Sequence, residues 1–328
     1  MTSQDIVVGN TKLIQVDGIY AKLECTNPCG SIKDRMVKYI LDESEKRGLF
    51  KPGMRVVEAT SGNTGIALTY YAKKKGYDVT IVMPENMTEE RKHILKVLGA
   101  NTILCSEQGS IAEAMAIRDD ILARDPNYFT LDQFSNPLNA ECHYKTTGQE
   151  ILAQIKDYTS NTTDAFVAGV GTGGSLIGVT KALKEANPQL HVAAVEPRES
   201  AVMSGGEPGP HGIQGIGDGF VPPIATGGNQ PLHELIDEVI CVSTEEAKSA
   251  AKYTYEKHGL CIGMSSGANY VAAKRIAERF KTVVTIFPDG FSLYGSLGLI
   301  RGEKRRCPFE KYRVNVLSSF GQDCLITY

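Results

Sequence analysis

Short apolar segments that are typical of β-strands alternate with amphipathic, helix-like segments along most of this chain, and glycine or proline turns separate them. In the first half, strands are expected at 55–59, 77–83, 101–105 and 128–131, with helices at 66–75, 89–98, 111–123 and 145–155. In the second half, strands are expected at 165–170, 192–196, 238–242 and 283–287, with helices at 176–185, 244–257 and 269–280. This order predicts an α/β fold in which doubly wound, mostly parallel sheets carry helices on both faces.

Length and charge narrow the functional classes. The 328 residues are enough for one or two domains with a sizeable core. The net charge is −3 and 22% of the residues are charged, so nothing in the composition calls for a nucleic-acid partner or a membrane surface. No apolar stretch reaches the length of a membrane span, and the N-terminus has no signal-peptide pattern. We therefore expect a cytoplasmic protein.

The eight cysteines are scattered along the chain, and only Cys25 and Cys29 lie close together in sequence. A C-x-x-x-C pair with no second pair and no nearby histidines is a weak signal for a metal. Reduced, mostly buried thiols are typical of cytosolic proteins. We therefore expect free thiols and no metal site.

The stretch from Asn27 to Arg35 joins a strand-like run at 19–24 to a helical pattern, and it contains Lys33. Asn-Pro and a glycine form the turn, and Ser31 is a suitable N-cap, which would place Lys33 in the first helical turn. The positive end of the helix dipole should lower the pKa of a lysine there, and a neutral amine can attack a carbonyl carbon. The alternative is an ordinary solvated surface lysine.

Two further loops join a strand to a helix and suit the binding of an anion. Residues 60–65 read Thr-Ser-Gly-Asn-Thr-Gly, and residues 169–175 read Gly-Val-Gly-Thr-Gly-Gly-Ser. Small residues let backbone amides approach a ligand, and a helix N-terminus attracts negative charge. The second loop also fits the dinucleotide-binding pattern G-x-G-x-x-G, with Glu196 about where such folds keep a ribose-binding acid. Its mid-chain position and its hydroxyl residues favour a single terminal phosphate instead.

Together these motifs resemble the cysteine synthase (O-acetylserine sulfhydrylase) family, which is similar to cystathionine β-synthases. The resemblance covers roughly residues 7–297 and extends to the segments at 9–13, 211–217 and 263–268. It implies the tryptophan-synthase-β-like fold, fold type II of the enzymes that use pyridoxal 5′-phosphate (PLP), with two doubly wound domains. We expect a larger PLP-binding domain of residues 1–32 and 138–328 and a smaller, mobile substrate-loop domain of residues 33–137.

The resemblance also implies a role for each matching residue. Lys33 forms the Schiff base with PLP and, once freed, removes the α-proton of the substrate. Ser265 faces the pyridine nitrogen, and Asn63 bonds the phenolic oxygen. The PLP phosphate is bound by Gly171, Thr172, Gly173, Gly174 and Ser175, and the substrate carboxylate is held by Thr60, Ser61, Asn63 and Gln133. His211 is expected to be a structural loop residue.

The implied reaction is a β-replacement on an O-activated L-serine, in which O-acetylserine and sulfide give L-cysteine and acetate. A cystathionine β-synthase-type reaction with homocysteine and a cysteine synthase that uses O-phosphoserine stay open. A dinucleotide oxidoreductase and a non-catalytic homologue that senses a metabolite or binds a partner are alternatives from other classes. The resemblance further implies a homodimer and, for some members, a complex with serine acetyltransferase.

Three places depart from the usual family pattern. Cys29 replaces a glycine, and Lys12 replaces a proline. Where the family has Pro-Asp-Ser-Gly-Glu-Arg-Tyr, this chain reads Pro288-Asp289-Gly290-Phe291-Ser292-Leu293-Tyr294. The loss of the Glu-Arg pair leaves the preference for a nucleophile or a leaving group open.

Overall fold

The computed structural model describes residues 7–60, 62–106, 110–228, 232–291 and 294. Their strands form two sheets. The larger sheet has six strands in the order β1 (Leu13–Val16), β2 (Ile19–Leu23), β10 (Val283–Phe287), β7 (Ala165–Gly169), β8 (His191–Pro197) and β9 (Glu238–Val242). Only the β1–β2 pair is antiparallel. The central strand β10 is buried along its whole length, because a parallel sheet is covered by helices on both faces.

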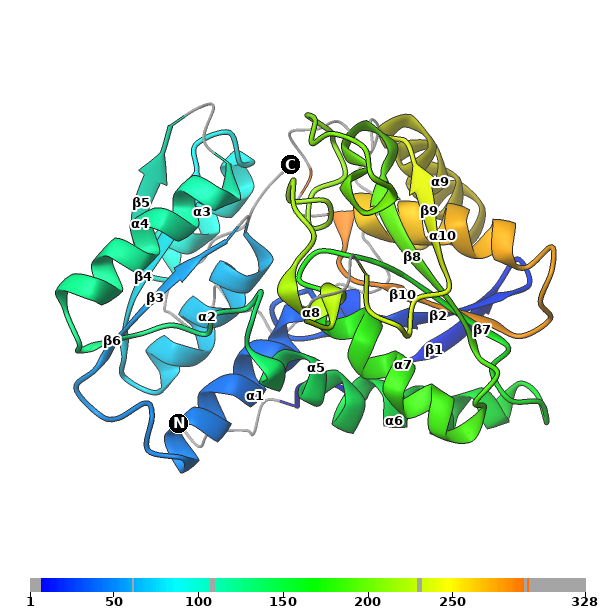
Figure 1. Cartoon of the computed structure of the whole chain (residues 1–328), viewed down its shortest axis with the longest axis horizontal. Helices are drawn as coiled ribbons and strands as arrows, with labels where there is room; N and C mark the ends of the chain where they lie inside the picture. The colour runs from blue at the N-terminus through cyan, green and yellow to red at the C-terminus, as the bar shows by residue number, and fades with distance from the viewer. Residues whose placement is uncertain (1–6, 61, 107–109, 229–231, 292–293, 295–328) are drawn as a thin grey trace.

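The smaller sheet has four parallel strands in the order β5 (Asn101–Cys105), β4 (Asp78–Pro84), β3 (Arg55–Ala59) and β6 (Tyr128–Phe129). It draws all its strands from the range 33–137, whereas the larger sheet takes its strands from outside that range. Figure 1 shows the two sheets in separate lobes, with the smaller sheet on the left. The domain boundaries at 32/33 and 137/138 stay a proposal.

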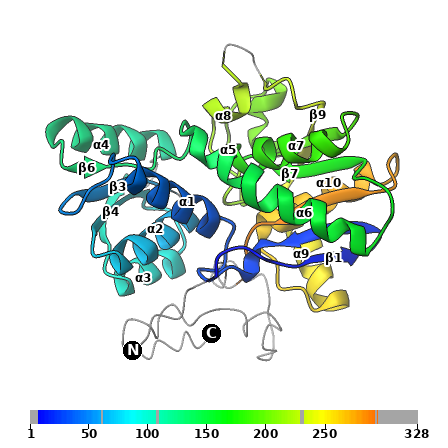
Figure 2. The same ribbon diagram turned by 90° about the horizontal axis from the view of Figure 1, so that it is seen from below.

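Ten α-helices pack on the described part of these sheets. In the smaller lobe these include α2 (Asn63–Lys74), α3 (Glu89–Val97) and α4 (Ile111–Arg124). The larger lobe carries α5 (Pro137–His143), α6 (Gln149–Gln154), α7 (Gly174–Ala186), α8 (Pro223–Thr226), α9 (Thr244–His258) and α10 (Met264–Ile276). The helix α1 (Lys33–Lys46) contacts both α2 and α5, so it lies where the two lobes meet (Figures 1 and 2).

The alternation of strands and helices is confirmed, with the expected bounds for β3, β5, β9 and β10. Three helices begin earlier than expected, because α2, α7 and α10 start inside the small-residue motifs at Asn63, Gly174 and Met264. Glycine and serine have low helix propensity, so the sequence pattern placed these starts too late. The motif residues therefore form first helical turns, where backbone N–H groups are available.

The single helix expected at 145–155 is wrong. The structure has α5, a π-helical turn at Tyr144–Gly148 and then α6. The helix α5 was missed, although Asn136 caps it by accepting a hydrogen bond from Leu138 N at 3.0 Å and Pro137 occupies its first turn. The wider turn lies against α7, where Gly178 is in close contact with the carbonyl of Ala140.

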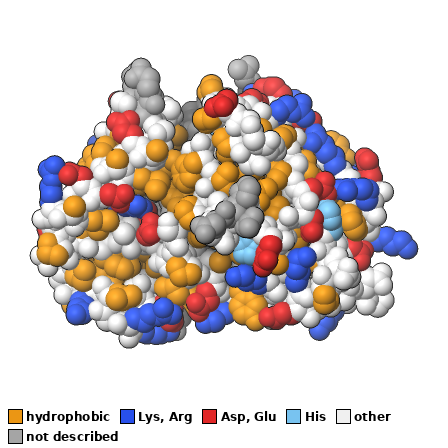
Figure 3. Space-filling view, in the orientation of Figure 1, with side chains coloured by type: hydrophobic (Ala, Val, Ile, Leu, Met, Phe, Trp, Pro, Cys, Tyr) orange, Lys and Arg blue, Asp and Glu red, His pale blue; other side chains and the backbone are white. Residues whose placement is uncertain are grey.

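The surface of the described residues carries charges of both signs. Figure 3 shows acidic and basic side chains interspersed over one face, in agreement with the small net charge. None of the helices in the described ranges has the length and apolar character needed to cross a membrane.

Replacing Gly178 by alanine tests the close packing of α5 on α7. A Cβ atom at Gly178 would lie 2.1 Å from the carbonyl oxygen of Ala140 and 2.8 Å from Cβ of His143. We expect Gly178→Ala to lower the free energy of unfolding by about 1–3 kcal/mol, because the overpacking exceeds the gain in helix propensity. Urea unfolding measures this, with Lys181→Ala on the exposed face of the same helix as the control. A Gly178→Ala protein as stable as the wild type would contradict the packing.

Candidate active site

One cavity collects most of the residues that the sequence singled out. It lies at the carboxyl ends of β3, β7 and β10, which is where open parallel sheets place their ligands. The expected residues that line it are Lys33, Thr60, Asn63, Gln133, Gly171, Thr172, Ser175 and Ser265. Gly173 and Gly174 lie within the same loop, and Ser61 lies outside the described residues.

Lys33 is the first residue of α1. The expected N-cap was Ser31, but the capping position is taken by Ile32, which has no side-chain cap. The reason is that Asp34 turns back on the preceding loop and accepts hydrogen bonds from Cys29 N at 2.9 Å and Ser31 N at 3.4 Å. Ser31 Oγ still accepts a hydrogen bond from Lys33 N at 3.3 Å. The expected place of Lys33 in the first helical turn is therefore confirmed.

The amine of Lys33 lies in an environment that favours its neutral form. Burial lowers the pKa of Lys33 below its usual range, while the negative charges of Asp218 and Asp289 act in the opposite direction. Desolvation disfavours the charged form of any ionisable group, which is why the direction is downward. A lysine with a lowered pKa can act as a nucleophile and as a base near neutral pH.

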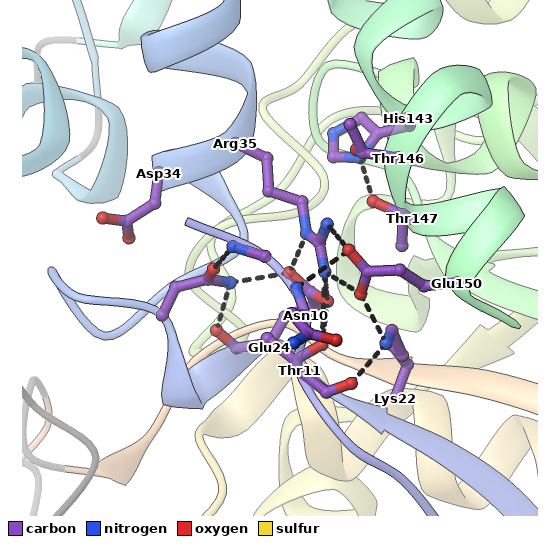
Figure 4. Close-up of polar contacts among 12 residues, drawn as sticks. Asn10, Thr11, Lys22, Glu24, Asp34, Arg35, His143, Thr146, Thr147 and Glu150 are labelled. Atoms are coloured by element: carbon purple, nitrogen blue, oxygen red, sulfur yellow. Dashed lines mark hydrogen bonds and ion pairs between the residues drawn. The ribbon is translucent and has the colours of Figure 1, made fainter. Parts of the chain in front are cut away.

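A buried cluster of ionic side chains fixes the chain on either side of Lys33. Figure 4 shows Arg35 between the carboxylates of Glu24 and Glu150. Its guanidinium donates to Glu24 at 2.7 and 2.8 Å and to Glu150 at 2.6 and 2.7 Å. Lys22 pairs with the far side of Glu150 at 2.7 Å, and Asn27 donates to Glu24 at 2.7 Å. The cluster joins the start of α1 to β2, to α6 and to the loop that precedes Lys33.

The loop at 60–65 ends β3 and begins α2. Thr60 accepts a hydrogen bond from Gly62 N at 3.0 Å, which tightens the loop. Gly62 has a φ of 142°, and a Cβ atom there would lie 2.3 Å from Cδ of Arg91, so only glycine fits. Asn63 donates to Asp289 at 2.8 Å, and its Oδ1 is buried without a hydrogen-bond partner among the described residues. That oxygen is available to a bound ligand.

Gln133 supports this loop from the neighbouring segment. Its amide donates to the carbonyl of Ala59 at 2.9 Å and accepts a hydrogen bond from Thr64 at 2.6 Å. The side chain is buried and lines the cavity. Gln133 therefore holds both ends of the loop, and its predicted contact with a substrate carboxylate stays a prediction.

The loop at 169–175 forms a cradle of backbone amides at the N-terminus of α7. Gly173 occupies the capping position with a φ of 84°, and no side chain caps the helix there. A Cβ atom at Gly171 would lie 2.4 Å from the carbonyl oxygen of Gly215, so the two loops approach as closely as glycine permits. Thr172 accepts a hydrogen bond from Asn139 at 2.9 Å. Such a helix start binds phosphate through its N–H groups and its dipole.

Glu196 does not serve this loop as a ribose-binding acid would. It is buried at the end of β8, where it accepts hydrogen bonds from Met203 N at 2.8 Å and from Ser204 N at 3.0 Å. Both carboxylate oxygens are thus used to hold the following segment of the chain. This arrangement gives no support to the dinucleotide alternative.

Asp289 connects the other motifs, and the sequence alone gave it no role. Its carboxylate accepts hydrogen bonds from Asn63 at 2.8 Å and from Tyr294 at 2.7 Å. Its backbone oxygen accepts from Gly263 N at 3.0 Å and from Ser266 Oγ at 3.2 Å, next to Ser265. Burial raises the pKa of Asp289, opposed by the Tyr294 hydrogen bond and the charge of Arg91.

His211 is placed as a structural residue. Its Nε2 lies 2.8 Å from the carbonyl oxygen of Gly217, and its Nδ1 accepts a hydrogen bond from Ile213 N at 3.2 Å. Because a carbonyl can only accept, Nε2 carries the proton and Nδ1 is the acceptor. Both ring nitrogens therefore serve the 211–217 segment.

Two charged residues that the sequence analysis missed also line the cavity, namely Arg91 from α3 and Asp218. Arg91 is fully buried, donates a hydrogen bond to Gln214, and lies over the ring of Tyr294 at 5.0 Å. Asp218 follows the 211–217 motif directly and stands between two glycines. An acid at such a constrained position beside a motif was the one available signal for it.

The profile of the pyridoxal-phosphate dependent enzyme family matches residues 5–289. This chain belongs to that family. It is 43% identical over 312 residues to cysteine synthase A of Salmonella typhi, covering 90% of this chain and 94% of that protein. Its structure is similar to that of a cysteine synthase from Entamoeba histolytica, with a TM-score of 0.81, 36% identity, and coverage of 95% of this chain and 93% of that chain.

A hydrogen sulfide-producing enzyme from Fusobacterium nucleatum is also similar, with a TM-score of 0.83 and 35% identity, and the match covers 95% of this chain and 93% of that chain. These findings confirm the resemblance and the expected α/β fold of PLP fold type II. They also identify the cofactor of this enzyme as PLP rather than a dinucleotide.

The cavity fits that cofactor. The uncapped start of α7 at Gly173 offers amides to a phosphate, and the amine of Lys33 lies in the same cavity. The glycine at 171 cannot carry a side chain, so this wall is shaped for close approach of a ligand to the backbone. The roles of Asn63 and Ser265 toward the ring stay predictions.

The ion cluster that positions this PLP enzyme's lysine makes a testable contribution at acidic pH. Burial would raise the pKa of Glu150, but the hydrogen bond and charge of Arg35, followed by those of Lys22, lower it to about 2. In the unfolded chain a glutamate has a pKa near 4.3. Because the folded pKa is the lower one, the stabilisation is present above about pH 4.3 and is lost as the pH falls toward 2.

We expect Glu150→Gln to lower the free energy of unfolding at pH 7 by roughly 2–3 kcal/mol, and we expect the difference from the wild type to shrink as the pH falls below about 4.3. Urea unfolding at a series of pH values measures both. Glu256→Gln is the control, because Glu256 is exposed and pairs with Lys252 at 3.7 Å. A difference between wild type and Glu150→Gln that does not depend on pH would contradict the assignment.

Proposed function

We propose that this PLP enzyme is a cysteine synthase, which replaces the acetoxy group of O-acetyl-L-serine by sulfide and releases L-cysteine and acetate. The observation that carries the proposal is the meeting of three groups in one cavity: the Lys33 amine, the 60–65 loop, and the amide cradle at 171–175. Its membership of the family and its 43% identity to a cysteine synthase support this choice of reaction.

Each group has a task that follows from its chemistry. When bound, PLP supplies an electron sink that stabilises negative charge at the α-carbon of the amino acid. The first turn of α7 holds the phosphate, and the 60–65 loop holds the substrate carboxylate through Thr60, Ser61 and Asn63. The neutral amine of Lys33 accepts the α-proton and returns a proton to that carbon at the end of the reaction.

Positioning of these groups depends on hydrogen bonds across the lobes. Asn63 belongs to the smaller lobe, yet its amide donates to Asp289 beyond β10 of the larger lobe. Arg91 of α3 reaches Gln214 of the 211–217 segment in the same way. These contacts hold the substrate loop against the lysine side of the cavity, which excludes water from the reacting atoms.

Absorption spectroscopy of the PLP-loaded protein tests the reaction. We expect the visible band of the lysine-bound cofactor to change when O-acetyl-L-serine is added and to return when sulfide follows. A response to O-phospho-L-serine alone, or return only with homocysteine, would replace this reaction by one of the two related ones. A band that responds to none of these would favour a non-catalytic homologue.

Lys33→Ala tests the role of the lysine. We expect acetate release from O-acetyl-L-serine to fall by at least about 10²-fold, because a positioned proton acceptor contributes roughly 10²–10⁴-fold. Lys38→Ala is the matched control, since Lys38 lies on the same helix and is exposed at its side chain. Unchanged acetate release in Lys33→Ala would rule out this mechanism.

We further propose that the enzyme works as a cytoplasmic homodimer, with serine acetyltransferase as a candidate partner. The six cysteines in the described ranges are free, which suits a reducing compartment. Sedimentation of the purified chain, alone and with a serine acetyltransferase, measures both associations. A monomer at micromolar concentration would exclude the homodimer.

A further inference from the structure

The carboxyl group of Asp218 lies in the active-site cavity and has no task in the reaction as proposed above. It is fixed there by the backbone on its N-terminal side. Gly217 donates a hydrogen bond to the carbonyl of Val170 at 3.1 Å and accepts one from His211 at 2.8 Å. Gly217 and Gly219 have φ values of 71° and 86°, so the segment follows a path that other residues rarely adopt.

The other acid in the cavity is already committed. Asp289 accepts hydrogen bonds from Asn63 and Tyr294, whereas no side chain or amide of the described residues donates to the carboxylate of Asp218. Asp218 and Lys33 interact electrostatically across the cavity, and each shifts the protonation of the other. Asp218 is therefore a carboxylate next to the reacting amine with its hydrogen-bonding capacity available to a bound molecule.

The proposed reaction leaves one proton without an acceptor. Lys33 takes the proton from the α-carbon and must give it back, so it cannot also keep a proton from the nucleophile. The acetoxy group leaves with its bonding electron pair as acetate. A nucleophile that enters as Nu–H forms its bond to the β-carbon and must lose its proton at the same time. Of the groups that face Asp218, Lys33 is occupied, Arg91 is always charged, and His211 is held by two backbone bonds.

We propose that Asp218 accepts the proton of the incoming nucleophile, so that this site uses neutral aliphatic thiols as well as sulfide. This inference rests on the proposed β-replacement. The Nu–H bond breaks, the Nu–Cβ bond forms, and the proton moves to the Asp218 carboxylate, which later releases it to water. A thiol with a pKa near 8.5 is mostly protonated at neutral pH, so it needs such an acceptor.

Burial raises the pKa of Asp218 above its usual range, and the positive charges of Lys33 and His211 limit the shift. A carboxylate with a raised pKa is a stronger base and is therefore better matched to a thiol. Arg91 and Asp289 face the same cavity from α3 and from the chain after β10, and they add charges of opposite sign.

The test compares two nucleophiles in one protein. 2-Mercaptoethanol carries a proton that must be removed, whereas azide is an anion at neutral pH and carries none. We expect Asp218→Asn to lower kcat/KM for 2-mercaptoethanol by about 10²–10⁴-fold, with O-acetyl-L-serine as the donor. The same variant should change kcat/KM for azide by less than tenfold, which also shows that it is folded. Asp218→Glu keeps the carboxylate and should recover part of the thiol reaction.

Two further measurements separate this role from a structural one. Glu207→Gln makes the same charge change at an exposed position of the same segment and should leave both nucleophiles unaffected. In the PLP-loaded enzyme without substrate, Asp218→Asn should move the pH titration of the lysine-bound cofactor band to lower pH, because a negative charge beside Lys33 is removed.

The outcomes distinguish the inference from the function on which it rests. If Asp218→Asn slows the thiol and azide reactions equally, or leaves the thiol reaction unchanged, Asp218 is not the proton acceptor, and the β-replacement itself stands. If the wild-type enzyme releases no acetate with any nucleophile, the proposed function is wrong and this inference falls with it.

Discussion

The pairing of Arg35 with Glu24 and Glu150 is the interaction on which the geometry of this active site depends. The guanidinium and Glu24 are buried, and ionised groups are costly to bury unless they are paired and hydrogen-bonded. The planar fork of arginine meets both carboxylates only when β2, α1 and α6 are all in place. Lys33 lies two residues from Arg35, so the same requirement fixes where its amine can point.

Asp289 acts as a second constraint on the opposite side of the cavity. It ties the substrate loop through Asn63 and the start of α10 through Ser266. The chain next to it pairs with Ser31, and Ile32 N donates to the carbonyl of Pro288 at 2.8 Å. Three motifs that are far apart in sequence thereby share one anchor. Tyr294 keeps its bond to Asp289 although the usual Glu-Arg pair before it is replaced, and residues 292–293 lie outside the described range.

The parts of this structure that the sequence predicted are those governed by local pattern. Apolar β-branched runs gave β3 and β10 their bounds, since a fully buried strand has few other choices. Glycine and hydroxyl residues at 60–65 and 169–175 identified the anion-binding loops because close approach to a backbone requires small side chains. The start of α10 at Met264 was missed because tertiary contacts, not propensity, hold its Ser-Ser-Gly turn in a helix.

The charged residues of the cavity were missed for a different reason. Arg91 lies on a helix whose pattern reads as solvated, and only the fold turns its side chain inward across Gly62. Asp218 and Asp289 carry no periodic signal, since an acid in a loop looks the same in sequence whether it faces water or a substrate. Their function depends on distances between segments that are 40 or more residues apart in the chain, such as α3 and the 211–219 segment.

The three ionisable groups Lys33, Asp218 and Asp289 explain why these separate constraints matter together. Burial lowers the pKa of the amine and raises the pKa of both carboxyl groups, so it favours the neutral form of each. Their mutual attraction favours the charged forms. Opposing effects of this kind bring the proton affinities of an amine and a carboxylate closer together than in water, which lowers the free-energy cost of moving a proton between them. An enzyme that must take a proton from one carbon and later return it needs such a balance, and rigid anchoring by Arg35 and Asp289 is what keeps the groups close enough to maintain it.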